Sequence, residues 1–339
     1  MFVQQTGGAF VTKARNPFPT LREHVIPQAA NAVKILLLVA ALLTVFVAMD
    51  GLAGSASHDA FSITMRGVAL LGVLILAIVA SMLMLAMAIL AHDGIHRVLF
   101  RSAIVNDLVS GLLAAFGAGV PFYANRQFHL AHHAHTHQGD QDPEHAINQG
   151  SFWRAFFVGP FVGVVIQYRL MLGNLWKREP KFLARALKDF GFVAAAAMGY
   201  TAGLSALGVS PLNTILPTLL VFPFTFAFRN MSDHFGLPRA KTKSERRREI
   251  VENGGGKNES IARRSNQQGS GRVIITAPWL EWLWNSVNYH EVHHRFPYLS
   301  HAYLKHAYAA TRDTHPYQEA QGYLRLLLEL RNRNYYSEE

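Results

Sequence analysis

The sequence predicts an all-α integral membrane protein with four transmembrane helices arranged as two hairpins. Half of the 339 residues are hydrophobic and only 16% are charged, which is too apolar a balance for a typical soluble enzyme. The apolar residues are also gathered into four runs. Each run is close to the ~20 residues that a helix needs to cross the hydrocarbon core of a bilayer.

The four predicted crossings form two pairs. The first pair comprises residues 31–54, with Lys34 near the start, and residues 68–91, which carry no charge. The second pair comprises residues 188–208 and 211–228. Two further apolar stretches, 104–122 and 152–172, are interrupted by charged residues, glycine or proline. These two stretches predict helices that lie in the membrane interface and pack against the bundle.

The distribution of basic residues predicts the orientation. Lys and Arg are scarce in the turns after the first and third crossings, and they are frequent in the N-terminal, middle and C-terminal segments. The positive-inside rule then places both termini and the segments between the two pairs on the cytoplasmic side of a multi-pass protein. The membrane would be the inner or plasma membrane if the protein is bacterial. No secretory signal is visible.

Composition excludes several classes of function. The chain has no cysteine, which excludes disulfides, a cysteine-bound iron–sulfur cluster and a fused rubredoxin-like electron carrier. The net charge of +10 needs no nucleic-acid partner, because basic residues on a cytoplasmic face set topology and attract anionic lipid.

The predicted organisation has three parts. Residues 1–30 form a cytoplasmic lead, residues 31–310 a membrane domain, and residues 311–339 a cytoplasmic tail with a helical, amphipathic stretch. Within the domain, residues 241–272 are polar and glycine-rich, which predicts a mobile cytoplasmic loop.

Nine histidines stand in four short groups, each beside an apolar run: His92 and His96; His129, His132 and His133; His234; and His290, His293 and His294. Within the groups the spacings are i, i+3 and i+4, which point the rings to one side of a helix. Imidazole is a common ligand of iron and zinc, and a closed zinc site takes only four ligands. Nine imidazoles on one membrane face therefore predict two metals held close together. Asn230, one turn before His234, is a candidate for a water-mediated ligand.

The remaining histidines have simpler interpretations. His135 and His137 follow the second group and are either partners of the ligands or exposed to solvent, and six others are interpreted as surface or interface residues: His24, His58, His145, His301, His306 and His315. Five carboxylates next to the groups are candidates to hydrogen-bond ligand imidazoles: Asp93, Asp142, Glu144, Asp233 and Glu291. For Asp93 and Glu291 a solvated carboxylate is an equal alternative.

Two other functions compete with the dimetal interpretation. His290, Glu291 and His294 satisfy the H-E-x-x-H pattern of zinc metalloproteases, with Glu291 as the general base. That interpretation leaves six histidines outside this motif unexplained: His92, His96, His129, His132, His133 and His234. A metal transporter would place ionisable residues inside the crossings, and these runs have almost none.

The order of the motifs resembles the membrane fatty acid desaturase superfamily, the histidine-box diiron desaturases and hydroxylases. The chain shows H-D-x-x-H at 92–96, H-x-x-H-H-x-x-T at 129–136, Asp233-His234, and N-Y-H-x-x-H-H-x-F-P at 288–297, so the resemblance covers about residues 60 to 310. It implies that two Fe ions are bound by the nine histidines on the cytoplasmic face of a four-helix domain, with Asn230 as a candidate water-mediated ligand. It implies no catalytic side chains beyond these ligands.

The resemblance also implies a reaction. Members use O2 and two external electrons to remove hydrogens from a lipid or fatty acyl chain, although relatives hydroxylate or ketolate lipids, carotenoids or small amphiphiles, and the motifs do not separate these outcomes. The electron donor would be a separate ferredoxin or b-type cytochrome with its reductase. A substrate channel between the crossings would be lined by residues such as Met82, Met84, Met87, Phe222, Phe224 and Phe226, for which ordinary helix packing is the favoured alternative.

Overall fold

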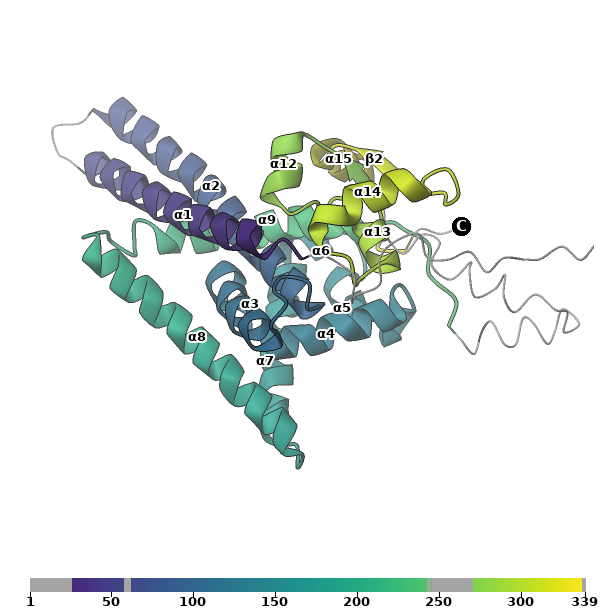
Figure 1. The fold of residues 1–339 in the computed structure, drawn as a ribbon. Helices are drawn as coiled ribbons and strands as arrows, with labels where there is room; N and C mark the ends of the chain where they lie inside the picture. Colours follow the sequence, from purple (N-terminus) through teal and green to yellow (C-terminus); the bar gives the residue numbers. More distant parts are fainter. Residues whose placement is uncertain (1–25, 58–61, 243–244, 246–270, 337–339) are drawn as a thin grey trace, which may run out of the picture.

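The computed structural model describes residues 26–57, 62–242, 245 and 271–336. Its two longest helices, α1 (Gln28–Ala56) and α2 (Ile63–Ile95), pack as a hairpin, drawn in purple and blue in Figure 1. One face of α1 is buried through a stripe repeating every three or four residues: Asn31, Lys34, Leu38, Leu42, Phe46 and Met49. The other face exposes large apolar side chains such as Leu36, which is 70% exposed. A continuous apolar face of this kind is unfavourable in water and suits contact with lipid.

Helix α2 is the central element of the fold. Its 33 residues extend about 50 Å at 1.5 Å per residue, which exceeds the ~30 Å hydrocarbon core. The first half exposes side chains such as Val68 (66%) and Leu71 (56%). The second half is buried by α1, α3 (Ala103–Ala118) and α9 (Ile215–His234). Its last turns, which carry His92, therefore lie inside the protein and away from lipid.

Helix α3 approaches the end of α2 very closely at Gly94. The side-chain amide of Asn106 donates a hydrogen bond to the carbonyl oxygen of Gly94 at 2.8 Å. A Cβ atom added at Gly94 would lie 2.4 Å from the Cβ of Ser110. Because non-bonded carbons do not approach that closely, only glycine permits this helix contact.

A sharp bend separates α3 from α4 (Phe122–His135), whose axes differ by 91°. Gly119 ends α3 in the left-handed region at φ 63°, which glycine adopts without strain. The first turn of α4 has no cap from its own N-cap residue, Pro121. Instead the Asp189 carboxylate of α8 accepts hydrogen bonds from the backbone N–H groups of Tyr123 (2.7 Å) and Ala124 (3.0 Å). A carboxylate at a helix N-terminus is favourable, so α8 fixes the start of the helix that carries His129, His132 and His133.

A run of helices continues the chain: η1 (Gly139–Gln141), α5 (His145–Asn148), α6 (Phe152–Phe157), α7 (Gly159–Leu175), α8 (Pro180–Ala206) and α9. The predicted interfacial helix 152–172 is thus broken in two at Val158. Helix α8 begins eight residues before the predicted crossing at 188, because its Lys, Arg, Leu and Ala residues continue the helix through the charged segment. α9 ends at His234 and contains Pro223.

The C-terminal part forms a cap over the histidine-bearing ends of α2, α4 and α9 (Figure 1). It contains a short parallel pair of strands, β1 (Val273–Ile275) and β2 (Glu319–Gln321), with α12 (Pro278–Leu283), α13 (His290–Arg295), α14 (His301–Thr311) and α15 (Tyr323–Leu330). α15 packs on α9 through Tyr323, Leu326, Leu327 and Leu330. The predicted tail therefore packs against the helical body, and the Tyr335 N–H donates to the carbonyl of Gly150 at 3.0 Å.

Three helices in the described residues are long and apolar enough to cross a membrane: α1, α2 and α9. The bent pair α3–α4 counts as a fourth only when it is treated as one span. α8, the predicted third crossing, is not among them, because Asp189, glycines and hydroxyl residues dilute its apolar side chains. The four-crossing topology therefore stays a prediction. Residues 1–25 and 246–270, which hold most of the predicted lead and loop, lie outside the described residues.

Candidate metal centre

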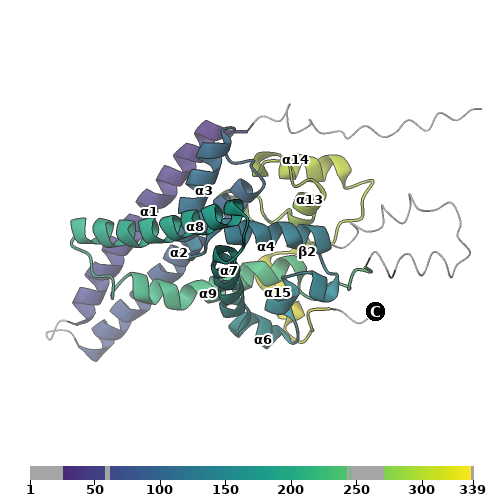
Figure 2. The same cartoon turned by 90° about the horizontal axis from the view of Figure 1, so that it is seen from below.

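The nine predicted histidines come together from four helices. His92 lies in the last turn of α2 and His96 directly follows it. The others lie on α4, at the end of α9 and on α13, and Figures 1 and 2 show α4 and α13 side by side. The rings form two groups, and within each group one nitrogen per residue lies within 4.8 Å of all the others.

The first group, termed here the five-imidazole group, consists of His92, His96, His129, His133 and His293. The Nε2 atoms of His96 and His129 are 2.9 Å apart, and those of His133 and His293 are 3.2 Å apart. Nitrogen ligands lie about 2.0–2.1 Å from a bound transition metal, so neighbouring ligands are ~3 Å apart and opposite ones ~4 Å. The spacing fits a shell around one cation.

The second group, termed the four-imidazole group, consists of His132, His234, His290 and His294. The Nε2 atom of His290 is 2.9 Å from that of His234 and 3.1 Å from that of His294. The Nε2 atom of His132 is 3.3 Å from that of His294. The four nitrogens therefore converge on one region, as the ligands of a second cation would.

Adjacent histidines belong to different groups. In the pair His132-His133 the first ring faces the four-imidazole group and the second the five-imidazole group, and in His293-His294 the order is reversed. The reason is helical geometry, because successive residues are rotated by ~100° about the axis. The rings of His133 and His294 stack at 4.1 Å between centroids, so the two groups are in contact.

Unpartnered nitrogen atoms support metal binding. Among the described residues, neither ring nitrogen of His92 has a hydrogen-bond partner, although both are buried. His132 places Nδ1 2.8 Å from Asp142, which assigns its proton to Nδ1 and leaves the Nε2 lone pair facing other imidazole nitrogens. Lone pairs that converge in a buried site are unfavourable without a cation between them. The residues present therefore fit two metal ions.

Burial also keeps the α13 imidazoles neutral. Desolvation, followed by the neighbouring imidazoles, lowers the pKa of His290, His293 and His294 well below the ordinary histidine value. Only a neutral imidazole offers a lone pair to a metal. These three rings are therefore in the ligand form at physiological pH.

Asp142 orients one ligand of the four-imidazole group. One carboxylate oxygen contacts His132 Nδ1 at 2.8 Å and accepts from the Glu144 N–H at 2.9 Å, and the other accepts from the His137 N–H at 2.8 Å. Burial alone would raise the pKa of Asp142, but the His132 imidazole and these hydrogen bonds outweigh it and lower the pKa. An ionised Asp142 thus holds His132 as the tautomer whose Nε2 faces the metal.

Replacing Asp142 with Ala is expected to lower metal affinity about 10–100-fold, as is typical when the partner of a ligand histidine is lost. Asp142→Asn retains one oxygen but loses the second acceptor, so its loss should be intermediate. Competition with a chelator measures both variants. Wild-type affinity in Asp142→Ala would show that His132 needs no carboxylate.

Two histidines interpreted as surface or interface residues contact buried carboxylates. His301 Nδ1 lies 2.7 Å from Asp93, and His315 Nε2 lies 3.1 Å from Glu291. His315 is 7% exposed, Glu291 1% and Asp93 6%, so the surface interpretation of His315 is wrong, as is the solvated alternative for both carboxylates. The sequence could have indicated these contacts. Asp93 and Glu291 stand next to grouped histidines, a buried carboxylate needs a hydrogen-bond partner, and histidine can serve as one.

The remaining candidates lie around the two groups. Asp233 forms an ion pair with Arg229 and lies 3.5 Å from His290 Nδ1. Asn230 is buried and donates to the Asn148 side chain at 3.3 Å, so its water-mediated role stays a prediction. The His137 ring contacts the Pro238 carbonyl, and His137 belongs to neither group.

The position of Glu291 argues against the zinc-protease alternative. Its carboxylate faces His315 and accepts a hydrogen bond from the Gln318 N–H at 3.0 Å. A general base must instead reach a metal-bound water between His290 and His294. Those two histidines also share their group with His132 and His234, which leaves less room for a peptide substrate.

Comparison with known proteins agrees with this geometry. No curated protein matches the chain. A family model described as fatty acid desaturase matches residues 67–322, about three quarters of the chain, and the match includes all nine histidines of both groups. The chain therefore belongs to the fatty acid desaturase family and is an oxidoreductase.

Proposed function

We propose that this protein is a membrane-bound diiron enzyme that uses O2 and external electrons to desaturate a lipid or fatty acyl chain. The observation that carries the proposal is the convergence of nine imidazoles into groups of five and four. Imidazole suits iron, and nine ligands exceed what one closed zinc site uses. Two bound irons would supply the activation of dioxygen that an unactivated C–H bond requires.

The residues of the chain have distinct tasks in this proposal. The five-imidazole and four-imidazole groups hold the metals, and Asp142 fixes the orientation of His132. The cap formed by α12 to α15 and the buried end of α2 cover the site and limit its contact with water. The reaction removes two hydrogen atoms from the acyl chain of the substrate. Together with two electrons from the donor and two protons, they reduce O2 to two waters.

The electrons come from a separate protein in this proposal, a ferredoxin or a b-type cytochrome with its reductase, because the chain has no cysteine for an iron–sulfur cluster of its own. The histidine groups and both termini lie on the cytoplasmic side, as the distribution of basic residues predicts.

Metal analysis combined with product mass tests the proposal. The protein purified in detergent would be supplied with iron, a ferredoxin reducing system and fatty acyl, sphingoid or carotenoid substrates. We expect about two irons per chain and an O2-dependent product two mass units lighter than the substrate. A product sixteen units heavier would replace desaturation with hydroxylation, and zinc with peptide cleavage would restore the protease alternative.

A further inference from the structure

The two histidine groups offer unequal numbers of donors. The five-imidazole group provides five nitrogens and the four-imidazole group provides four. Four imidazoles complete the tetrahedral shell that zinc prefers, whereas non-haem iron in oxygenases is commonly bound by imidazoles together with a carboxylate. The four-imidazole group therefore has a place for one oxygen donor if it binds iron.

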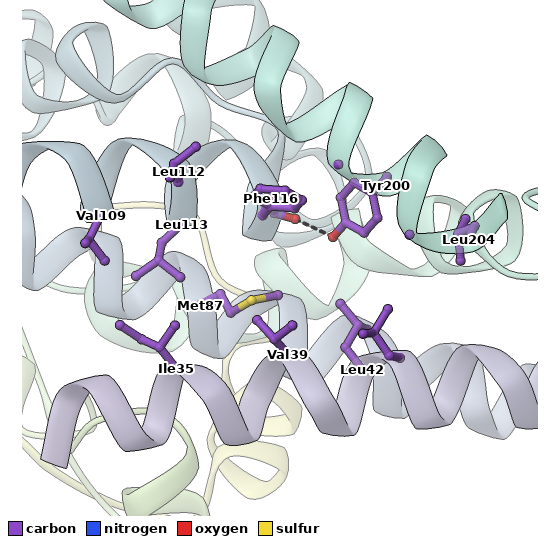
Figure 3. Close-up of a pocket in the computed structure, with 13 residues that line it drawn as sticks. Ile35, Val39, Leu42, Met87, Val109, Leu112, Leu113, Phe116, Tyr200 and Leu204 are labelled. Carbon is purple, nitrogen blue, oxygen red and sulfur yellow. Dashed lines mark hydrogen bonds between the residues drawn. The ribbon is translucent and has the colours of Figure 1, made fainter. Parts of the chain in front are cut away.

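The apolar cavity between α1, α2, α3 and α8 does not supply that donor. Tyr200 carries the one polar group in its lining, and Figure 3 shows this hydroxyl donating to the carbonyl oxygen of Phe116, at 2.7 Å. Of the six residues predicted to line a substrate channel, only Met87 borders this cavity. An oxygen donor must come from another part of the fold.

Glu144 places a carboxylate at the edge of the four-imidazole group. Its Oε1 atom lies 3.9 Å from Nε2 of His132, the nitrogen that faces the other rings of the group. Asp142 and Asp233 instead approach Nδ1 atoms of their histidines. A separation of 3.9 Å is too long for a hydrogen bond, but two ligands at about 2.0–2.2 Å from one metal are ~3–4 Å apart. Glu144 therefore has the position of a ligand and not that of an orienting carboxylate.

The carboxylate of Glu144 also needs a cation. Glu144 is 9% exposed, and its Oε2 atom is buried without a hydrogen-bond partner among the described residues. The Arg229 guanidinium acts on it electrostatically but is already paired with Asp233. A buried carboxylate is unfavourable unless it is paired, hydrogen-bonded or bound to a metal. A cation in the adjacent group would satisfy it.

The backbone holds Glu144 next to a ligand imidazole. One oxygen of Asp142 accepts a hydrogen bond from the Glu144 N–H at 2.9 Å, and the same oxygen contacts His132 Nδ1 at 2.8 Å. The carbonyl oxygen of Glu144 accepts from the Asn148 N–H at 3.1 Å, where α5 begins. One buried carboxylate thus positions both His132 and Glu144, as the hydrogen-bond partners of metal ligands do.

We propose that Glu144 is an anionic oxygen ligand of the metal in the four-imidazole group, so that each metal has five protein donors. The inference rests on the two-metal centre of the function proposed above. Glu144 is not among the residues whose donor atoms lie within 4.8 Å of one another, so its side chain must turn toward the cation when the metal binds. The two shells then differ in charge, because the carboxylate adds a negative charge that favours the more oxidised metal.

Metal affinity in Glu144→Gln tests the proposal, because this variant keeps the shape of the side chain and removes its charge. Chelator competition for iron(II), on the full chain in detergent, should show one metal bound as in the wild type and the other at least ~10-fold more weakly. Asp140→Asn is the matched control, since it removes the same charge from an exposed side chain in the same loop. It should bind both metals normally.

Rescue by a small carboxylate separates loss of a ligand from damage to the fold. Glu144→Ala should also bind one metal weakly, and cobalt(II) loaded in place of iron should show an altered visible spectrum for one of its two ions. Added acetate should restore both the affinity and the spectrum, because it supplies the missing oxygen donor. Chloride at the same ionic strength should restore neither.

Three results would overturn the inference. The first is normal affinity for both metals in Glu144→Gln. The second is tighter binding in that variant, since a carboxylate that paired with a charged His132 would compete with the cation. The third is loss of the metal in Asn230→Ala but not in Glu144→Gln, which would assign the fifth donor to Asn230. Fewer than two metals in the wild type would count against the proposed function, and the response of the remaining metal to Glu144→Gln would still decide the inference.

Discussion

Replacing His132 or its neighbour His133 with Ala is expected to remove a different metal in each case. His132 belongs to the four-imidazole group and His133 to the five-imidazole group, so each variant should retain about one metal per chain in place of two. Turnover should fall by at least ~100-fold in both, because losing a ligand costs more than the 10–100-fold typical of its hydrogen-bond partners. Metal analysis and O2-dependent turnover measure these effects.

The matched control for both variants is His306→Ala, which removes an exposed imidazole of α14 that lies outside both groups. It should retain both metals and full turnover. If His132→Ala and His133→Ala left the same metal behind, the division of adjacent histidines between two sites would be wrong. Full activity with normal metal content in either one would remove that histidine from the ligand set.

A second large effect is expected from a single added methyl group, in Gly94→Ala. The new Cβ would lie 2.4 Å from the Ser110 Cβ and 1.7 Å from its hydroxyl oxygen, so α2 and α3 must separate. Overpacking of this kind costs about 1–3 kcal/mol. The strain also falls between His92 and His96, so the five-imidazole group should bind its metal more weakly. Thermal unfolding in detergent and chelator competition measure the two effects.

The double variant Gly94→Ala with Ser110→Gly provides the decisive comparison. It removes both atoms that the new methyl group meets, so stability and metal affinity should largely recover. Ser110→Gly alone should cost only ~1 kcal/mol, the penalty of glycine within a helix. If the double variant lost as much stability as the sum of the two single losses, the helix contact at Gly94 would not be the cause.

The sequence was sufficient to predict which histidines converge but not how they divide into two groups. Spacings of three and four residues determine which rings share a helix face, and this predicted all nine histidines of the two groups. Which ring faces which metal depends on how α4 and α13 cross, and helix spacing carries no information about that angle. The Asp93–His301 contact was missed for the same reason, since these residues are 208 positions apart.

The fold was predictable where apolar runs dominate. The helices at 31–54 and 68–91 are present with longer ends, as α1 and α2, because neighbouring residues of moderate helix propensity extend them. The bend between α3 and α4 depends on Gly119 and on a carboxylate that α8 supplies from a distant part of the chain. The strand pair β1–β2 has three residues in each strand, too few for a periodic signal.

The wide separation of the ligands along the chain has a consequence for biogenesis. The first and last histidines of the two groups, His92 and His294, are 202 residues apart. At ~5–20 residues per second, a ribosome needs about 10–40 s to synthesise that interval. The Lys34 ammonium, moreover, donates to the carbonyl oxygen of Trp282 and to Asn285, so even the first helix completes its contacts only when the cap has been made. Both groups include histidines of α13, so neither ring of imidazoles is complete until the cap has been synthesised, and we expect metal loading to follow that step.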